Sequence, residues 1–183
     1  GAAKDAAVAA AEEHPAVPKP PDGFEQATPR FSPEGKFVGY DLSKGFKVPA
    51  GFDARFQYGP DGAVTHFDAH ASVGMDTASR ELLKPDWRAT FESRIPRTTT
   101  KPLLGPFFKM TVRVPPEMTA RAETRLAEDF GARVTWIWKY QQGLSGLERA
   151  GMGNSSEAKY LKGLITTYKQ EANELMGGKD VFR

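Results

Sequence analysis

The sequence has no cysteine, which excludes thiolate zinc sites, cysteine nucleophiles and disulfide scaffolds. It also has no apolar run near the length of about 20 residues that a membrane-spanning helix needs. Lys and Arg number 25 against 23 Asp and Glu, so the net charge of +2 produces no strong field of either sign. A dedicated nucleic-acid-binding protein is usually more basic than this.

Strong core-forming residues are scarce, because Leu, Ile, Val and Phe together make up 36 of the 183 residues. A share of about one fifth is the lower edge of globular composition. The shortage is uneven: residues 1–50 contain seven of the 14 prolines, whereas residues 51–140 and 155–176 carry amphipathic patterns. The sequence therefore predicts a compact domain with a long N-terminal arm.

Residues 1–50 are predicted to form this extended arm, since proline lacks the N–H that helix propagation needs. Ordering such a chain costs roughly 1 to 2 kcal/mol of backbone entropy per residue, which the protein's own domain or a partner must offset. We favour a partner; the alternative is a disordered tail. The sequence begins with Gly1 rather than Met, from which we expect that a targeting segment has been removed. The predicted partner-binding side chains of the arm are Phe24, Phe31, Phe37, Tyr40 and Phe46.

Residues 51–73 predict a β-hairpin, because apolar and polar side chains alternate on both sides of the turn Gly59-Pro60-Asp61-Gly62. Two registers compete. The turn residues favour a three-residue loop that pairs Gly59 with Ala63. A four-residue loop pairs Tyr58 with Ala63 and keeps the apolar side chains of both strands on one face of the hairpin. We expect burial to decide in favour of the four-residue loop.

Residues 76–95 predict two short helices broken at Pro85, and residues 96–106 predict a loop. Residues 107–140 predict a strand, a helix that begins at Pro115-Pro116 and ends at Gly131, and a second strand over 133–140. The run FFKMTVRVPPEMTARAETRLAEDFGARVTWIWKYQ resembles the second half of a ferredoxin-like domain, as in a small-subunit ribosomal protein of that fold. This resemblance implies a strand–helix–strand unit.

Residues 143–183 predict a glycine-rich hinge followed by an amphipathic helix that Gly177-Gly178 terminate. Asn154 and Glu157 have the spacing of a capping box at the start of this helix. We expect the helix either to fold back on its own sheet or to dock elsewhere. Tyr160 and Tyr168 are its predicted partner-binding side chains.

Two residue sets could carry chemistry. His66, Asp68 and His70 share one face of a predicted strand and are weak candidates for a metal site. Their outer Cα atoms would be roughly 13 Å apart, which favours a polar surface instead. Trp136, Trp138 and Tyr140 alternate along the second predicted strand; they could stack on single-stranded nucleic acid, although core packing is the commoner use of such a stripe.

The sequence thus predicts an α+β protein: a small antiparallel or mixed sheet with one packed helix, a long extended N-terminal arm and a C-terminal amphipathic helix. Its predicted parts are residues 1–50, 51–142 and 143–183. We expect a non-enzymatic accessory subunit of a large organellar complex, respiratory or photosynthetic. It would clamp protein neighbours through the arm and the last helix, without a catalytic residue or cofactor. The expected location is the mitochondrion rather than the chloroplast, peripheral to a membrane complex. The alternatives are an RNA-contacting ribosomal-type subunit and a metal-dependent enzyme at His66, Asp68 and His70.

Overall fold

The computed structural model describes residues 17–20, 27–42, 46–105 and 107–183. The fold is α+β, as predicted, with small antiparallel sheets and four helices among these residues. No helix in these ranges has both the length and the apolar character needed to cross a membrane. The chain divides into two compact units, one made of residues 1–72 with 139–165 and the other of residues 73–138 with 166–183.

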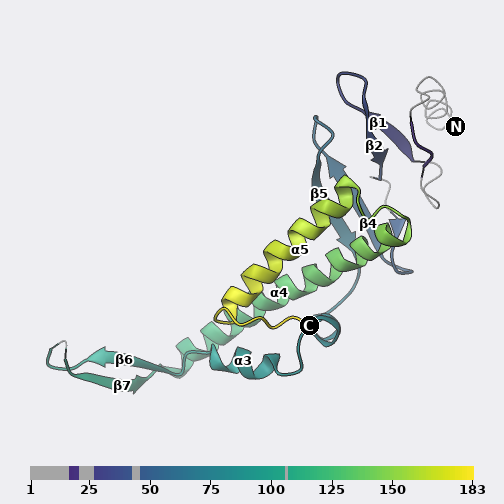
Figure 1. Ribbon diagram of the computed structural model, residues 1–183. Coiled ribbons are helices and arrows are strands. Elements are labelled where there is room, and N and C mark those ends of the chain that lie inside the picture. Colours follow the sequence, from purple (N-terminus) through teal and green to yellow (C-terminus); the bar gives the residue numbers. More distant parts are fainter. Residues whose placement is uncertain (1–16, 21–26, 43–45, 106) are drawn as a thin grey trace. The chain divides into compact units, whose positions relative to one another are not determined.

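The first unit contains two small sheets and segments of two helices (Figure 1). Strands β1 and β2 pair with each other, and β3, β4 and β5 form a three-stranded antiparallel sheet in that order. The strand bounds are β1 Thr28–Phe31, β2 Phe37–Asp41, β3 Phe46–Lys47, β4 Asp53–Tyr58 and β5 Val64–His70. Helix α4 spans Pro116–Arg149 and helix α5 spans Ser156–Leu175; the first unit takes residues 139–149 and 156–165 of them.

The hairpin β4–β5 combines the three-residue turn with a bulge that keeps the apolar side chains of both strands on one face. The Gly59 amide donates to the Ala63 carbonyl (2.9 Å), and Gly62 has a left-handed φ of 83°, as the turn residues favour. The pairing then shifts by one residue between Gln57 and Tyr58, so that Phe56 lies opposite Phe67. The predicted four-residue loop is wrong. The predicted apolar face is confirmed, because the bulge returns both apolar sets to it.

Helix α4 corrects the largest error of the sequence analysis. Residues 133–140 are helical rather than a strand, and the helix continues through Gly131 to Arg149. Alternation of large side chains favoured a strand, but the buried positions Phe130, Val134 and Ile137 follow the three- and four-residue spacing of a helix. Ile137, which the strand pattern placed on the outer face, is fully buried. The ferredoxin-like strand–helix–strand is therefore absent from this region.

Two glycines of α4 let the helix approach the sheet of the first unit closely. A Cβ atom at Gly143 would lie 2.7 Å from the Phe67 ring, and one at Gly146 would lie 2.4 Å from a Val48 methyl group. Both distances are far below the normal carbon contact of roughly 3.5 to 4 Å. These glycines were predicted to form a hinge; instead they lie in a helix and remove side-chain bulk where the backbone and the sheet meet.

The second unit is mainly helical. Its short helices are α2 Met75–Leu82 and α3 Trp87–Ser93, which confirms the two helices broken at Pro85. The rings of Trp87 and Phe130 stack with their centroids 5.7 Å apart and 9° between their planes. The buried side chains of this unit come from α2, α4, α5 and the C-terminal residues; they include Ala78, Leu83, Phe130, Val134, Ile137, Ala172, Met176, Val181 and Phe182.

The C-terminal residues pack on this unit after α5 ends. Gly177 and Gly178 both have left-handed φ angles and terminate the helix, as predicted. The Asn173 side chain then accepts a hydrogen bond from the Val181 amide (3.1 Å), and Phe182 forms an antiparallel bridge with Leu83. The sequence analysis assigned no role to these last residues.

The start of α5 differs from the predicted capping box. The Ser155 hydroxyl accepts a hydrogen bond from the Ala158 amide (3.1 Å), so Ser155, not Asn154, caps the helix. Glu157 is then directed into the first unit and is 3% exposed.

Candidate interaction site

Residues 96–129, which we call the exposed limb, include no buried residue within their described part. The limb consists of strands β6 Thr98–Pro102 and β7 Lys109–Arg113 and the first four turns of α4. Among the described residues, seven large apolar side chains are exposed, and six of them belong to the limb: Leu103, Leu104, Phe107, Phe108, Met110 and Met118. Large apolar side chains exposed on one segment are typical of an interaction site.

Strands β6 and β7 form a two-stranded antiparallel hairpin that extends outward from the beginning of α4 (Figure 1). This region was predicted to be a loop up to residue 106, and that prediction is wrong because β6 pairs with β7 along its whole length. The hairpin base is fixed by two hydrogen bonds. The Val114 amide donates to the Arg97 carbonyl (3.0 Å), and the Thr119 hydroxyl donates to the Pro96 carbonyl (2.9 Å). An isolated two-stranded hairpin is at best marginally stable in water, so a partner surface would stabilise this one.

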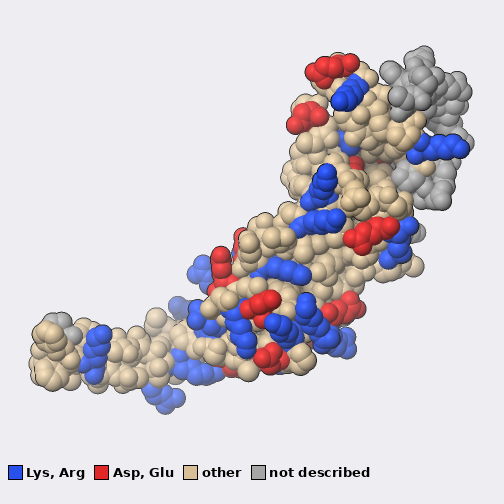
Figure 2. All heavy atoms as spheres, in the orientation of Figure 1, with Lys and Arg blue, Asp and Glu red and all other residues tan. Residues whose placement is uncertain are grey.

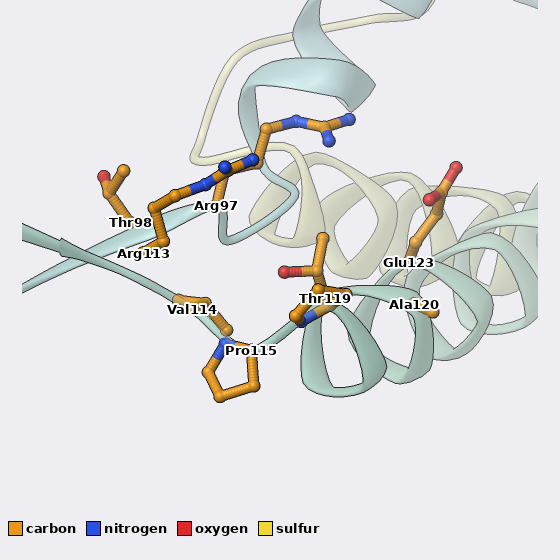
Figure 3. A pocket seen from close by; sticks show the side chains of 9 residues that line it. Arg97, Thr98, Arg113, Val114, Pro115, Thr119, Ala120 and Glu123 are labelled. Carbon is orange, nitrogen blue, oxygen red and sulfur yellow. The ribbon is translucent and has the colours of Figure 1, made fainter.

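An open hollow of about 590 Å³ lies where the hairpin meets α4. Figure 3 shows Arg97 and Arg113 extending over it from the hairpin base, with Pro115 and Thr119 on other sides. Arg97 forms an ion pair with Glu92 (3.3 Å), in which both side chains are largely exposed. The charged residues that line the hollow are Arg97, Arg113 and Glu123, and among the described residues Arg113 has no ion pair.

A second hollow of about 320 Å³ lies beside α3 and is lined by Trp87, Phe91 and Phe130. Carboxylates of Asp76, Glu92 and Glu123 surround these rings. Aromatic rings and carboxylates together attract cations. The protein already supplies one, because the Arg88 guanidinium lies 4.9 Å from the Trp87 ring centroid.

The arm is attached to the first unit through Arg30. Its guanidinium donates to the Gly62 carbonyl (2.5 Å), pairs with the Glu157 carboxylate (3.3 Å) and lies 3.7 Å from the centroid of the Tyr58 ring. The two charged side chains are 13% and 4% exposed, so the pair is largely removed from water. Arg30 therefore links β1 to the turn of one hairpin and to α5.

The Tyr58 hydroxyl completes this cluster. It donates to the Glu157 carboxylate (3.0 Å) and accepts a hydrogen bond from the Leu42 amide (3.2 Å). Burial raises the pKa of Tyr58 well above its usual range, and the negative charge of Glu157 raises that pKa further. The phenol is held in its neutral form, in which it can donate a hydrogen bond to Glu157.

The predicted partner-binding side chains of the arm have mixed positions. Tyr40 is buried in its own unit, and its hydroxyl donates to the Pro18 carbonyl. Phe31 and Phe37 are half-buried and make an edge contact with centroids 6.1 Å apart. Phe24 and the side chain of Phe46 lie outside the described residues. Residues 28–42 form a hairpin within the first unit, and whether a partner binds the arm stays a prediction.

The two predicted tyrosines of α5 are both half-buried. The Tyr160 hydroxyl donates to the Thr65 carbonyl (2.7 Å), so this side chain fixes α5 to β5. Tyr168 belongs to the second unit. Whether either residue also binds a partner stays a prediction.

His66, Asp68 and His70 do not form a ligand set. Asp68 accepts a hydrogen bond from the Gln57 amide group (2.5 Å), and His66 Nδ1 lies 3.1 Å from the Thr65 hydroxyl oxygen. Within the described ranges no three His, Cys, Asp or Glu side chains are placed to hold a metal ion. The aromatic stripe also changes, because Trp136 and Trp138 are two positions apart on a helix and so point in different directions. The Trp138 indole donates to Glu81 (2.8 Å).

The sequence analysis missed the exposed limb, although a signal was present. Two pairs of neighbouring large apolar residues, Leu103-Leu104 and Phe107-Phe108, lie close together between Lys101 and Lys109. Apolar residues so close to a turn have no strand or helix face to bury them. The chain matches no protein-family model, no curated protein and no solved structure.

Proposed function

We propose that the protein is a non-enzymatic accessory subunit of a large assembly and that the exposed limb is its main contact with neighbouring subunits. One observation supports this most strongly: no described residue from 96 to 129 is buried, and six large apolar side chains of the segment are exposed. Ordering each residue costs roughly 1 to 2 kcal/mol of backbone entropy, and the limb has no core of its own to offset that cost. A neighbouring surface would supply the missing burial.

The proposal moves the contact from the arm to the limb. The described arm residues 28–42 are attached to their own unit by Arg30, so they are less available to neighbours than the sequence indicated. Within the limb, Met118 is 58% exposed on the first turns of α4 and offers an apolar contact near the hollow. An organellar location, peripheral to a membrane complex, remains part of this proposal.

The RNA-contacting alternative depended on an aromatic strand at residues 134–140. That segment is a helix, so no observation on the described residues favours this alternative.

The test uses the full chain, tagged and expressed in its source cells, with gentle extraction and native size separation. We expect the chain to migrate in a particle much larger than its own 20.1 kDa. Met118→Gln should lower its share in the particle. The matched control is Val38→Gln, which changes the one exposed large apolar residue found outside the limb among the described residues. Migration of the unaltered chain as a free monomer would overturn the proposal, and an equal effect of the two variants would overturn the role of the limb.

A further inference from the structure

The end of the β6–β7 hairpin carries four exposed apolar side chains. Leu104 is 95% exposed and Phe107 is 92% exposed, and Leu103 and Phe108 beside them are also exposed. We call these four residues the apolar tip. They come from both sides of the hairpin, since the Leu103 amide donates to the Phe108 carbonyl (2.7 Å). Four exposed apolar side chains at one end of a hairpin favour apolar surroundings.

The backbone keeps the tip in an unusual conformation. Leu104 is the one non-glycine residue with a positive φ among the described residues, at 55°. This region is unfavourable for a Leu side chain, and such residues concentrate at functional sites. Its side chain makes almost no contact with its own protein, so packing within the chain does not explain the conformation.

The charges of the hairpin all have one sign. Between Pro96 and Pro116 the charged residues are Arg97, Lys101, Lys109 and Arg113, with no Asp or Glu. Lys101 pairs with Met110 and Lys109 with Pro102, so both lysines lie directly behind the tip. Figure 2 shows uncharged atoms at the end of the hairpin, Lys and Arg along it, and no acidic residue on the face of the hairpin that is drawn.

We propose that the apolar tip inserts into an anionic lipid surface and that Lys101 and Lys109 bind the lipid phosphates. Lys101 lies two residues behind Leu103, which is roughly 7 Å along a strand. This spacing matches the depth of about 5 to 10 Å to which interfacial segments bury their apolar side chains. The tip would then lie among acyl chains while the lysines remain at the headgroups.

Other partners fit the tip less well. A second copy would bring two positively charged hairpins together, which is unfavourable. Single-stranded RNA would need cations beside stacking rings, but here two leucines share the tip with the rings and the cations lie behind them. The inference goes beyond the proposed accessory role: it assigns the four tip residues of the limb to lipid and leaves Met110 and Met118 for contact with neighbouring subunits. Vesicle binding tests the tip and Met118→Gln tests the subunit contact, so either can fail without the other.

The first experiment measures binding of the full chain to vesicles by co-flotation at physiological ionic strength. We expect binding to phosphatidylcholine vesicles that contain phosphatidylserine and much weaker binding to phosphatidylcholine alone. Leu104→Ser with Phe107→Ser should weaken binding about 100-fold or more, since burying each such side chain changes an equilibrium about tenfold or more. Both residues are exposed, so the thermal unfolding of this variant should match that of the parent chain.

A matched pair of charge variants tests the geometry. Lys109→Gln and Arg113→Gln each remove one positive charge from β7, but Arg113 lies roughly 13 Å farther from the tip. That distance exceeds the Debye length of about 8 Å at physiological ionic strength. Lys109→Gln should therefore weaken binding about fivefold and Arg113→Gln less than twofold.

Insertion itself is read from Phe107→Trp: the difference between its emission and that of the parent chain, which has three tryptophans, should shift to shorter wavelength with the anionic vesicles. Absence of vesicle binding, equal effects of Lys109→Gln and Arg113→Gln, or unchanged binding after loss of Leu104 and Phe107 would each overturn the inference. Binding of a single-stranded oligouridylate that depends on Phe107, without vesicle binding, would replace lipid by RNA as the partner.

Discussion

Gly146 of α4 provides the sharpest test of how the first unit is packed. Replacing it with alanine adds one carbon atom 2.4, 2.7 and 3.0 Å from three carbons of Val48. Val48 is 4% exposed, so its side chain has little space into which it can move. The helix or the strand must separate by about 1 Å to restore a normal carbon contact.

The expected magnitude combines two opposing effects. Overpacking a core by one carbon costs typically 1 to 3 kcal/mol. Alanine is preferred over glycine in a helix interior by about 1 kcal/mol, which offsets part of that cost. We therefore expect Gly146→Ala to lower the free energy of unfolding by up to about 2 kcal/mol.

The matched control is Gly163→Ala, because Gly163 lies in α5 with no atom within 4 Å of the added carbon. This variant should gain up to about 1 kcal/mol. Urea unfolding followed by circular dichroism measures both. In Gly146→Ala, a second change of Val48→Ala should cost less than the same change in the parent chain. If both glycine variants are stabilised equally, the helix and the sheet do not meet closely at Gly146 and the packing described above is wrong.

Three further predictions concern buried contacts. Arg30→Met should destabilise the chain by about 3 to 5 kcal/mol in urea because it leaves the Glu157 carboxylate buried without its partner; adding Glu157→Met should recover part of that loss, and full additivity of the two changes would contradict the pair. Because folding raises the pKa of Tyr58, the unfolded chain loses this proton first, so stability should fall as pH rises above about 10. Tyr58→Phe should lack that decrease when urea midpoints are compared between neutral and alkaline pH, and identical slopes would refute it. Phe182→Ala should cost about 3 to 5 kcal/mol in the same assay, since the ring is 4% exposed; a change within error would show that the C-terminal residues do not belong to the core.

Local rules predicted several elements correctly. Alternation and the turn residues identified the β4–β5 hairpin, Pro115-Pro116 marked the start of α4, and Gly177-Gly178 marked the end of α5. Each of these signals acts within a few residues, so the sequence alone carries it.

The errors arise where tertiary contacts decide the outcome. Gly143 and Gly146 were predicted to form a hinge. Their role is to allow close contact with Phe67 and Val48, which are distant in the sequence, so neighbouring residues do not reveal it. Glu157 was interpreted as a cap, but Arg30 and Tyr58 bind it across 127 and 99 positions of the chain. The bulge in β5 likewise reconciles a local turn with a non-local burial pattern.

For the candidate site too, local signals were visible in the sequence and tertiary contacts were not. The arm was expected to be the contact surface because it is rich in proline. The residues of the limb were assigned partly to a predicted loop and partly to a predicted strand–helix–strand unit. Only the pairing of β6 with β7 shows that Leu103 and Phe108 meet at one end of a hairpin. Their closeness in the sequence indicates an exposed apolar turn. It does not indicate the two paired strands on which that turn lies.

The most direct test of the central claim is site-specific photocrosslinking in the intact source cells. A photoreactive phenylalanine analogue replaces Met118 of the exposed limb in one variant and Gly163, an exposed position of α5 with open space around it, in the other. The account predicts that position 118 forms a discrete crosslink to another protein and that position 163 forms far less. A chain that crosslinks to nothing at position 118 and is recovered as a monomer would contradict the claim that the limb joins this protein to an assembly.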